Sequence, residues 1–389
     1  MNNHLKHVIK ALPRYRDAAS AIKESLLANL VLLGEIPAPT FSEQNRLELL
    51  GERFRGSQLA QVGTDGVGNC QATLPGTPGG QNILIVAHAD CVVPQDEDHT
   101  ISIESDRIVG SGVGDNSLGL AVLPTIPELL KKLDVSLKSN IILLAVTRSL
   151  GRADLEGIRF FLDHNELPIA ATICLEGVQL GRLSIASIGM LRGEITCRVP
   201  DEYDWSRFGT GGAIFELNEV ISRLVEIPLP SRPRSSIVLG SVRAGTSFNR
   251  VATNAILRFE IRSQSANLVD RVCGEVEDIV IQANSATEAE VTLNVLARRT
   301  PGGLIAGHPL PRAARQIMTE LNVDPRLAPS TSELSAFIDR DIPGLTIGLT
   351  KGEHISEERE SIEIEPIFTG LSQLVGILVA LDSGLCNDD

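Results

Sequence analysis

The sequence has few aromatic residues, an excess of acidic over basic residues and no long apolar run. Only 3% of its 389 residues are aromatic, so the core must be built mainly from aliphatic side chains. The formal net charge of −14 argues against a nucleic-acid partner, because binding phosphates requires a basic surface. The sequence shows no basic amphipathic helix of the kind that binds a membrane surface. We also expect no segment to reach the apolar length that spans a bilayer.

Paired cysteines and a recognisable secretion signal are also missing. The region 1–40 has no uninterrupted apolar stretch after its charges, which is unlike a signal peptide and predicts a cytoplasmic location. Cys91 adjoins a candidate metal site, but a ligand role for it is the less favoured interpretation. The six cysteines form no CxxC pair, which predicts buried free thiols at Cys70, Cys91, Cys174, Cys197, Cys273 and Cys386.

The length and the apolar pattern predict two domains of different type. A chain of 389 residues with 43% hydrophobic residues is too long for one ordinary core. Apolar runs at 82–88, 140–146 and 170–177 alternate with helical patterns at 118–133 and 154–165. Such alternation predicts an α/β fold, a mostly parallel sheet flanked by helices on both faces.

The pattern changes after residue 188. Residues 190–199 alternate polar and apolar side chains, which is typical of a strand with one wet face. Further strands and two helices follow up to residue 298. We therefore predict a main domain at 1–188 and 299–389, with a small α+β lid or dimerisation domain inserted at 189–298.

Polar side chains stand at the ends of the apolar runs. In open parallel sheets, ligands bind beyond the carboxyl ends of the strands. Each residue alone has an ordinary explanation: a loop histidine with a capping aspartate, a helix cap, or a surface residue. Together they predict a metal site, because three oxygen or nitrogen ligands with an open position suit a hydrolytic zinc ion. The residues are His88, Asp90, Asp115, Glu176 and His354.

At this point the chain resembles a known family, the co-catalytic zinc metallopeptidases of the aminoacylase, carboxypeptidase and succinyl-diaminopimelate desuccinylase group. The resemblance implies that Asp115 bridges two zinc ions, that His88 and Glu176 bind one of them, and that His354 binds the other. It places Asp90 behind His88, where a carboxylate fixes the imidazole tautomer. The stretches that carry it are "EIPAPTFSEQNR", "ILIVAHADCVVP", "RIVGSGVGDNSLGLAVL", "ATICLEG", "AGTSFNRVATNAILRFEIRS" and "IPGLTIGLTKGEH".

Two positions depart from the family pattern in a way that changes the chemistry. Ser149 aligns with the glutamate that acts as general base, and Leu150 aligns with a glutamate that binds the second zinc ion. Leucine has no lone pair for a metal, and serine has no useful proton affinity near neutral pH. Asp154, Glu156 and Glu353 flank the affected turns. Asp154 could replace the base only if its turn folds differently, and a carboxylate at a helix N-terminus is its favoured interpretation.

The family's substrate-binding residues are only partly retained. Asn249 and Arg262 match positions that bind the substrate's carbonyl and carboxylate, and a surface salt bridge is an equally good explanation of Arg262. The stretch 199–212 has no counterpart of the family's histidine, and "PSTSELSAF" replaces its Ser-Thr-Asp-Ala-Asn stretch. The resemblance also implies a homodimer that pairs through the inserted domain.

Three functions remain open from the sequence. The preferred one is a divergent amidohydrolase-like protein with one zinc ion or none, acting on a small N-acyl amino acid or peptide-like molecule. Without an activated water, such a site would favour acyl transfer or condensation over hydrolysis. The first alternative is an inactive pseudo-hydrolase that serves as a binding or scaffold protein. The second is an ordinary two-zinc peptidase or amidase, with no nucleic-acid or membrane partner in any of the three cases.

Overall fold

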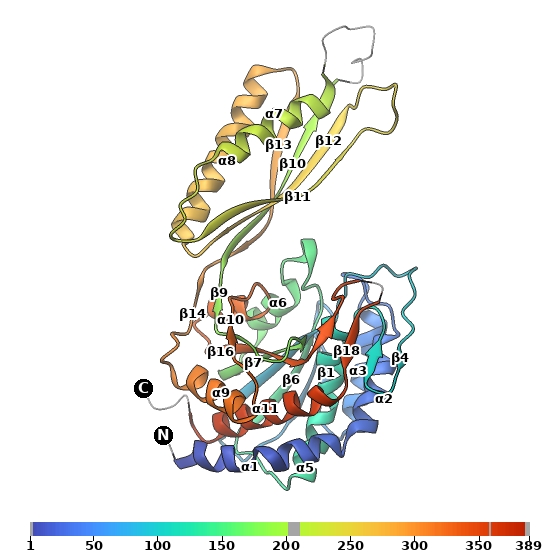
Figure 1. Ribbon diagram of the computed structural model, residues 1–389, viewed down its shortest axis with the longest axis vertical. Coiled ribbons are helices and arrows are strands. Elements are labelled where there is room, and N and C mark those ends of the chain that lie inside the picture. The colour runs from blue at the N-terminus through green and yellow to red at the C-terminus, as the bar shows by residue number, and fades with distance from the viewer. Residues whose placement is uncertain (1–2, 201–210, 358, 386–389) are drawn as a thin grey trace. The chain divides into compact units, whose positions relative to one another are not determined.

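The computed structural model describes residues 3–200, 211–357 and 359–385, and the chain divides into two compact units. Unit 1 comprises Met1–Ala186 and Gly303–Asp389, and unit 2 comprises Ser187–Gly302 (Figure 1). The boundaries predicted from the sequence, at 188/189 and 298/299, lie a few residues from these. The predicted fold class, an α/β domain with an inserted α+β domain, is confirmed.

Unit 1 is built on an eight-stranded sheet with the order β1-β2-β6-β3-β7-β16-β8-β15. The four central strands β6, β3, β7 and β16 run parallel. They are the apolar runs of the sequence, and nearly every residue in them is buried. The strands are β1 (Ala60–Thr64), β2 (Cys70–Leu74), β3 (Asn82–His88), β6 (Asn140–Val146), β7 (Ile169–Val178), β8 (Arg182–Ser184), β15 (Arg326–Leu327) and β16 (Gly344–Thr350).

Helices cover both faces of this sheet, and alternate strand residues pack on opposite sides. Ile83 and Ile85 belong to the core formed with α1, α9 and α11, whereas Leu84 and Val86 pack with α6 and α10. The helices are α1 (Asn3–Ser20), α2 (Lys23–Gly34), α3 (Gln44–Gly56), α4 (Leu118–Val122), α5 (Ile126–Lys132), α6 (Glu156–His164), α9 (Pro309–Glu320), α10 (Leu334–Ile338) and α11 (Glu365–Asp382).

One helical prediction needs correction. The helix predicted at 118–133 is divided into α4, a short 3₁₀ helix (Leu123–Thr125) and α5, because Pro124 and Pro127 each lack an amide hydrogen. Residues 16–34 are divided between two helices, α1 and α2. Helix α3 begins at Gln44, and its N-cap residue Glu43 makes no side-chain capping bond.

Helix α11 corrects a further expectation. It is long and apolar enough to cross a membrane by length and composition, although no such segment was expected. However, 72% of its 18-residue window is buried inside the protein, which is typical of a core helix. The five cysteines in the described part of the chain are free and buried, as predicted, and Cys386 lies outside the described residues.

Unit 2 has its own core between one sheet and two helices. Its antiparallel sheet has the order β11-β12-β10-β13 and packs against α7 and α8 through residues such as Ile195, Leu257 and Val276. The elements are β10 (Gly189–Arg198), α7 (Gly212–Glu226), β11 (Ser235–Ala244), β12 (Asn254–Ser263), α8 (Ala266–Ala286) and β13 (Glu290–Arg299).

Short strands complete the two units. Four of them form a second sheet in unit 1, which the sequence did not predict: β4 (Ser102–Ile103), β5 (Arg107–Val109), β17 (Gly352–Glu353) and β18 (Ser361–Glu363). A two-stranded sheet pairs β9 (Ala186–Ser187) with β14 (Gly302–Gly303).

Candidate metal centre

His88 and Glu176 meet because of the strand register. In the parallel pair β3–β7, Val86 lies opposite Cys174. Residues two positions further along each strand project from the same face. His88 and Glu176 therefore leave the sheet side by side at its carboxyl end, on the face that carries Val86 and Cys174.

Asp115 reaches the same place from the wide helical turn Val113–Ser117. The next residue, Asn116, ties this turn to β7: its Nδ2 donates to the Leu175 carbonyl at 2.8 Å, and its Oδ1 accepts from Gly177 N at 2.9 Å. Buried Glu360 holds the turn from the other side, since its Oε1 accepts from Asp115 N at 2.9 Å. These contacts place Asp115 beside Glu176.

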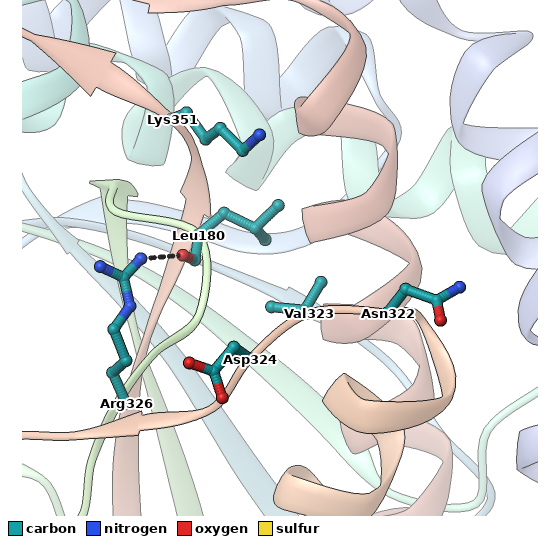
Figure 2. Close-up of a pocket in the computed structure, with 6 residues that line it drawn as sticks. All are labelled: Leu180, Asn322, Val323, Asp324, Arg326 and Lys351. Atoms are coloured by element: carbon teal, nitrogen blue, oxygen red, sulfur yellow. Dashed lines mark hydrogen bonds between the residues drawn. The ribbon is translucent and has the colours of Figure 1, made fainter.

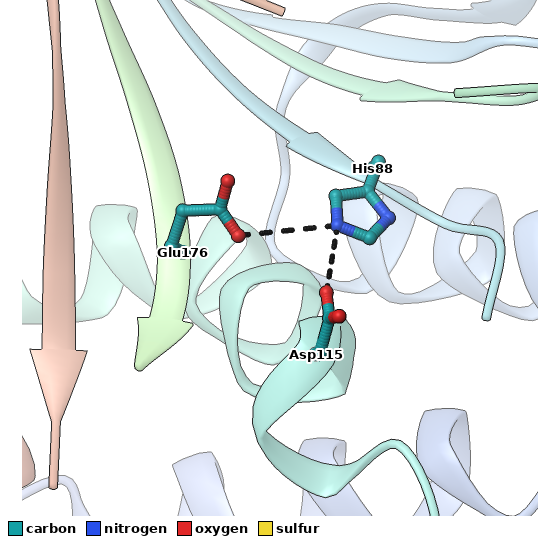
Figure 3. Close-up of side chains that lie close together, drawn as sticks. All are labelled: His88, Asp115 and Glu176. Carbon is teal, nitrogen blue, oxygen red and sulfur yellow. Dashed lines mark ion pairs between the residues drawn. The ribbon is translucent and has the colours of Figure 1, made fainter. Parts of the chain in front are cut away.

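The three side chains form a compact cluster (Figure 3). His88 Nε2 lies 3.1 Å from Asp115 Oδ1 and 4.0 Å from Glu176 Oε2. One ligand atom from each residue lies within 4.8 Å of the other two. One imidazole nitrogen and two carboxylate oxygens are the donor set of a zinc ion with an open position. The geometry therefore fits one metal ion.

The cluster perturbs the protonation of its members. Burial alone would lower the pKa of His88, but its contacts with Asp115 and Asp90 outweigh burial and raise that pKa well above its usual value. Burial raises the pKa of Glu176 to about 7, although His88 and Arg182 oppose this. Burial would also raise the pKa of Asp115, yet the hydrogen bond from His88 leaves it lowered. The raised pKa values of His88 and Glu176 favour the protonated form of two groups that must lose a proton to bind a metal ion.

Asp90 acts on both His88 and the turn at 149–150. Its backbone oxygen lies 3.0 Å from His88 Nδ1, closer than its carboxylate Oδ1 at 3.4 Å. Its Oδ2 accepts from Thr40 Oγ1 at 2.9 Å, Ser149 N at 3.0 Å and Leu150 N at 2.8 Å. The carbonyl and the carboxylate together hold His88 with Nε2 toward the cluster, while the carboxylate also fixes the turn.

The turn brings no carboxylate of its own to the cluster. Ser149 Oγ is buried, and it has no hydrogen-bond partner in the part of the chain that the structure describes. The neighbouring acids are engaged by arginines: Asp154 Oδ2 lies 3.5 Å from Arg159, and Glu156 Oε1 lies 2.5 Å from Arg148. Replacement of the missing base by Asp154 is therefore not favoured by this geometry.

Of the other predicted site residues, His354 belongs to unit 1, and Asn249 and Arg262 belong to unit 2. His354 is 62% exposed, and its Nδ1 lies 3.2 Å from Glu357 Oε2. In unit 2, Asn249 is exposed on a loop and Arg262 pairs with Glu260. Most of the stretch expected to lack the family's histidine, 201–210, lies outside the described residues.

Sequence reasoning missed several residues that shape the centre. Asn116 and Glu360 orient Asp115, and Arg182 lies 4.0 Å from Glu176. Glu333, within the altered stretch "PSTSELSAF", is buried and its Oε1 has no hydrogen-bond partner among the described residues. A polar residue next to a glycine-rich turn was the only signal for Asn116, and the others follow no local pattern.

Comparisons with known proteins give the same architecture. A family model described as the peptidase dimerisation domain matches residues 207–288. Three solved structures superpose along the chain. The aminopeptidase PepT from Bacillus cereus has 19% identity and a TM-score of 0.70, with 92% of this chain and 98% of that chain covered. The chain has the fold of the M20 metallopeptidases.

Two further M20-fold structures extend the comparison. Human carnosine dipeptidase 1 has 12% identity, a TM-score of 0.74 and coverage of 96% and 100% of the two chains. The metallo-carboxypeptidase Sso-CP2 from Sulfolobus solfataricus has 15% identity, a TM-score of 0.76 and coverage of 92% and 99%. No curated protein sequence matches. The resemblance inferred from the sequence is thus confirmed at the level of the M20 fold, and a metal ion is consistent with the His88, Asp115 and Glu176 cluster.

Proposed function

We propose that this chain is a divergent M20-fold protein that holds one metal ion and acts on a small amide-containing molecule, an N-acyl amino acid or a short peptide. The observation that carries the proposal is the cluster of His88, Asp115 and Glu176 beside a turn that offers Ser149 and Leu150 instead of carboxylates. Three ligands suffice for one zinc ion. Asp115 and exposed His354 are too few for a second.

The chain's own residues define what such a site can do. When bound, a zinc ion would supply a Lewis acid for the amide carbonyl. Asp90 holds His88 in the tautomer that presents Nε2 to the cluster. Ser149 cannot take a proton near neutral pH as a carboxylate would, and the loss of a general base typically costs about 10²–10⁴-fold in rate.

Weak water activation favours acyl transfer or condensation over hydrolysis. An amine nucleophile that arrives with the substrate needs less help from a base than water does, because it is more nucleophilic when neutral. The carbonyl carbon would form a bond to the nitrogen of the incoming amine while its bond to the original amide nitrogen breaks, and the proton that the incoming amine loses would pass to the departing amine. The test of this step is to add an amine acceptor and measure the ratio of new amide to free acid. Formation of the free acid alone would contradict it.

Metal content and activity of matched variants test the proposal. We expect one zinc ion per wild-type chain by elemental analysis, and two per chain in Ser149→Glu/Leu150→Glu. The control Ser149→Gln/Leu150→Gln has nearly the same shape without the charge, and should hold one. Two ions in the wild type, or turnover of N-acyl amino acids or dipeptides at roughly 1–10³ per second, would sink the proposal and favour an ordinary two-zinc peptidase.

A second candidate is a non-catalytic binding protein. It is favoured by buried Ser149, which leaves the base position without a proton acceptor near neutral pH. In that case the wild type would retain no stoichiometric metal but would still bind amide-containing molecules. Calorimetric titration without and with zinc separates the two candidates, because only the first requires zinc for tight binding.

We also propose that the chain forms a homodimer through unit 2 and is located in the cytoplasm. The matched model is named for dimerisation, and large apolar side chains are exposed on unit 2: Ile214, Phe215 and Val225 on α7, and Val238 and Val242 on β11. Light scattering should give twice the 41.8 kDa chain mass. Phe215→Glu/Val225→Glu and Val238→Glu/Val242→Glu should reveal which surface pairs, and a monomeric wild type would refute the dimer.

A further inference from the structure

A buried acid without a partner lies on the same side of the sheet as the metal cluster. Glu333 is only 3% exposed, and its Oε1 has no hydrogen-bond partner in the part of the chain that the structure describes. Glu333 is the N-cap residue of α10, yet its side chain makes no capping bond to that helix. Burial of an unpaired carboxylate costs stability, and a ligand that supplies the missing counter-charge would offset this cost.

The backbone around Glu333 is fixed by neighbouring serines. Ser330 Oγ lies 2.8 Å from Ser332 Oγ, and Ser335 Oγ donates to the Ser332 carbonyl at 2.8 Å. These hydroxyls bond to one another and to the backbone, so the loop has a defined path. The loop thus holds Glu333 in place and leaves its Oε1 free for a ligand.

The topology directs Glu333 toward the cluster. Helix α10 packs with Val86 and Cys174, on the sheet face from which the cluster's histidine and glutamate project. The chain leaves α10 through residues 339–343 and enters β16 at Gly344, at the amino ends of the parallel strands. The first residues of α10 therefore lie toward the carboxyl ends of the strands, where the cluster is.

The charge of Glu333 acts on two members of the cluster. Burial is the largest cause of the raised pKa of Glu176, and the negative charge of Glu333 adds to it. Burial alone would lower the pKa of His88, whereas the same charge contributes to raising it. Both effects agree with the position that the topology gives to Glu333.

Formal charges leave Glu333 without a counter-charge even in a site that holds one metal ion. The two positive charges of a zinc ion and the one of Arg182 would balance the carboxylates of Asp90, Asp115 and Glu176. Glu333 is not among the described residues whose ligand atoms gather within 4.8 Å, so a metal ion is not its expected partner. An ammonium group needs only one carboxylate, with which it forms charge-assisted hydrogen bonds.

A pocket elsewhere in unit 1 is less suited to a cation. Figure 2 shows Arg326 with one amino group that donates to the Leu180 carbonyl at 2.9 Å. The basic side chains of this pocket outnumber its single acid, Asp324, so its field opposes an ammonium group. The pocket has a volume of about 290 Å³ and is lined by Leu180, Asn322, Val323, Asp324, Arg326 and Lys351.

We propose that Glu333 binds the ammonium form of the amine that accepts the acyl group. The inference rests on the proposed function and deepens it, because it names a primary amine as the acceptor and the residue that holds it. The carboxylate would take one proton from the bound ammonium, forming an O–H bond as the N–H bond breaks, and leave a neutral amine to attack the carbonyl carbon. The departing amine would receive that proton as well and leave as an ammonium ion, which restores the Glu333 carboxylate.

Paired ligands test the proposal by calorimetric titration of zinc-loaded protein. Glycinamide, alaninamide and leucinamide carry an ammonium group at about pH 6.5, whereas their N-acetyl derivatives carry no charge. Glu333→Gln should weaken binding of the ammonium forms by about 10–100-fold, as expected for a charged hydrogen bond, and leave the N-acetyl forms unchanged. Glu333→Asp keeps the charge and should lose less. With leucinamide as acceptor, Glu333→Gln should also lower the ratio of new amide to free acid by about tenfold or more.

Two substitutions serve as controls. Glu43→Gln is matched in burial, because Glu43 is also 3% exposed, but its Oε1 already accepts from Arg148 N at 2.8 Å. Asp324→Asn removes the acid of the pocket in Figure 2. Both should bind the ammonium forms as the wild type does. Without ligand, Glu333→Gln should melt at the wild-type temperature or above it, because it removes an unpaired buried charge, whereas a structural acid would give a loss.

Several outcomes would overturn the inference. These are equal losses for the ammonium and N-acetyl forms, unchanged binding in Glu333→Gln, an equal loss in either control, a lower melting temperature of Glu333→Gln, or no binding of the ammonium forms by the wild type. Zinc content of the same samples separates this result from the proposed function. A wild type with two ions or none refutes the one-metal proposal, whereas the binding comparison, repeated without added zinc, still decides whether Glu333 holds an amine.

Discussion

The contacts of Asp90 lead to a prediction about the turn that replaces the glutamate pair. Asp90 is fully buried, and its Oδ2 accepts the backbone amides of Ser149 and Leu150 as well as the Thr40 hydroxyl. Asp90→Ala leaves these donors without their acceptor. The Ser149 amide is buried and the Leu150 amide partly so, and each unsatisfied buried donor costs about 1–3 kcal/mol. We expect a loss of about 2–4 kcal/mol in the stability of this region.

Hydrogen exchange measures this loss where it occurs. A chain of two units need not unfold in one step, so a global midpoint is a poor reporter. The peptide that contains residues 147–155 should exchange about 30–1000-fold faster in Asp90→Ala, the equivalent of that free energy. Asp90→Asn keeps an acceptor oxygen and should change exchange about tenfold or less. Wild-type exchange in Asp90→Ala, or equal effects of Ala and Asn, would refute the reasoning.

Three other predictions concern the same unit. Zinc affinity should fall as pH is lowered through about 7, because Glu176 and His88 have raised pKa values and a metal must displace their protons. Calorimetry that shows the same zinc affinity from pH 5.5 to 8 would contradict this. Glu360→Ala should reduce zinc affinity about tenfold or more by releasing the Asp115 amide, whereas Glu360→Gln should lose less; equal titrations would exclude a positioning role. Arg46→Met should destabilise unit 1 by at least about 3 kcal/mol, since the buried guanidinium donates to three backbone carbonyls, and unchanged hydrogen exchange in the peptides that contain residues 34–36 and 89 would disprove this.

Much of the fold and part of the centre could be predicted from the sequence. Strands β3, β6, β7 and β16 are buried on both faces, so they appear as continuous apolar runs that only a covered parallel sheet explains. His88 and Glu176 end two such runs and must meet at one edge. The sequence also contains the reason why the helix at 118–133 is interrupted, since Pro124 and Pro127 each remove a backbone amide donor.

The remaining features depend on contacts between distant segments. Glu360 bonds to the amide of Asp115 across 245 positions, and nothing near Glu360 marks it as a buried acid. Arg182 follows β7 after a reversal of the chain, and the short strand β8 that carries it has no periodic pattern. The position of His354 depends on a left-handed turn with φ of 55°, and the apolar strand before it gave no indication of that turn. Such features follow from tertiary packing.

The manner in which the 149–150 turn is held explains how the chemistry can change while the fold persists. Asp90 accepts backbone amides, and every residue except proline supplies one. The path of the turn is therefore insensitive to whether glutamate, serine or leucine occupies these positions. Substitutions at positions 149 and 150 can therefore change metal binding while the backbone contacts to Asp90, and the stability they provide, are kept. Similarity of fold to the M20 metallopeptidases is therefore weak evidence for their activity, which depends on the side chains at this turn.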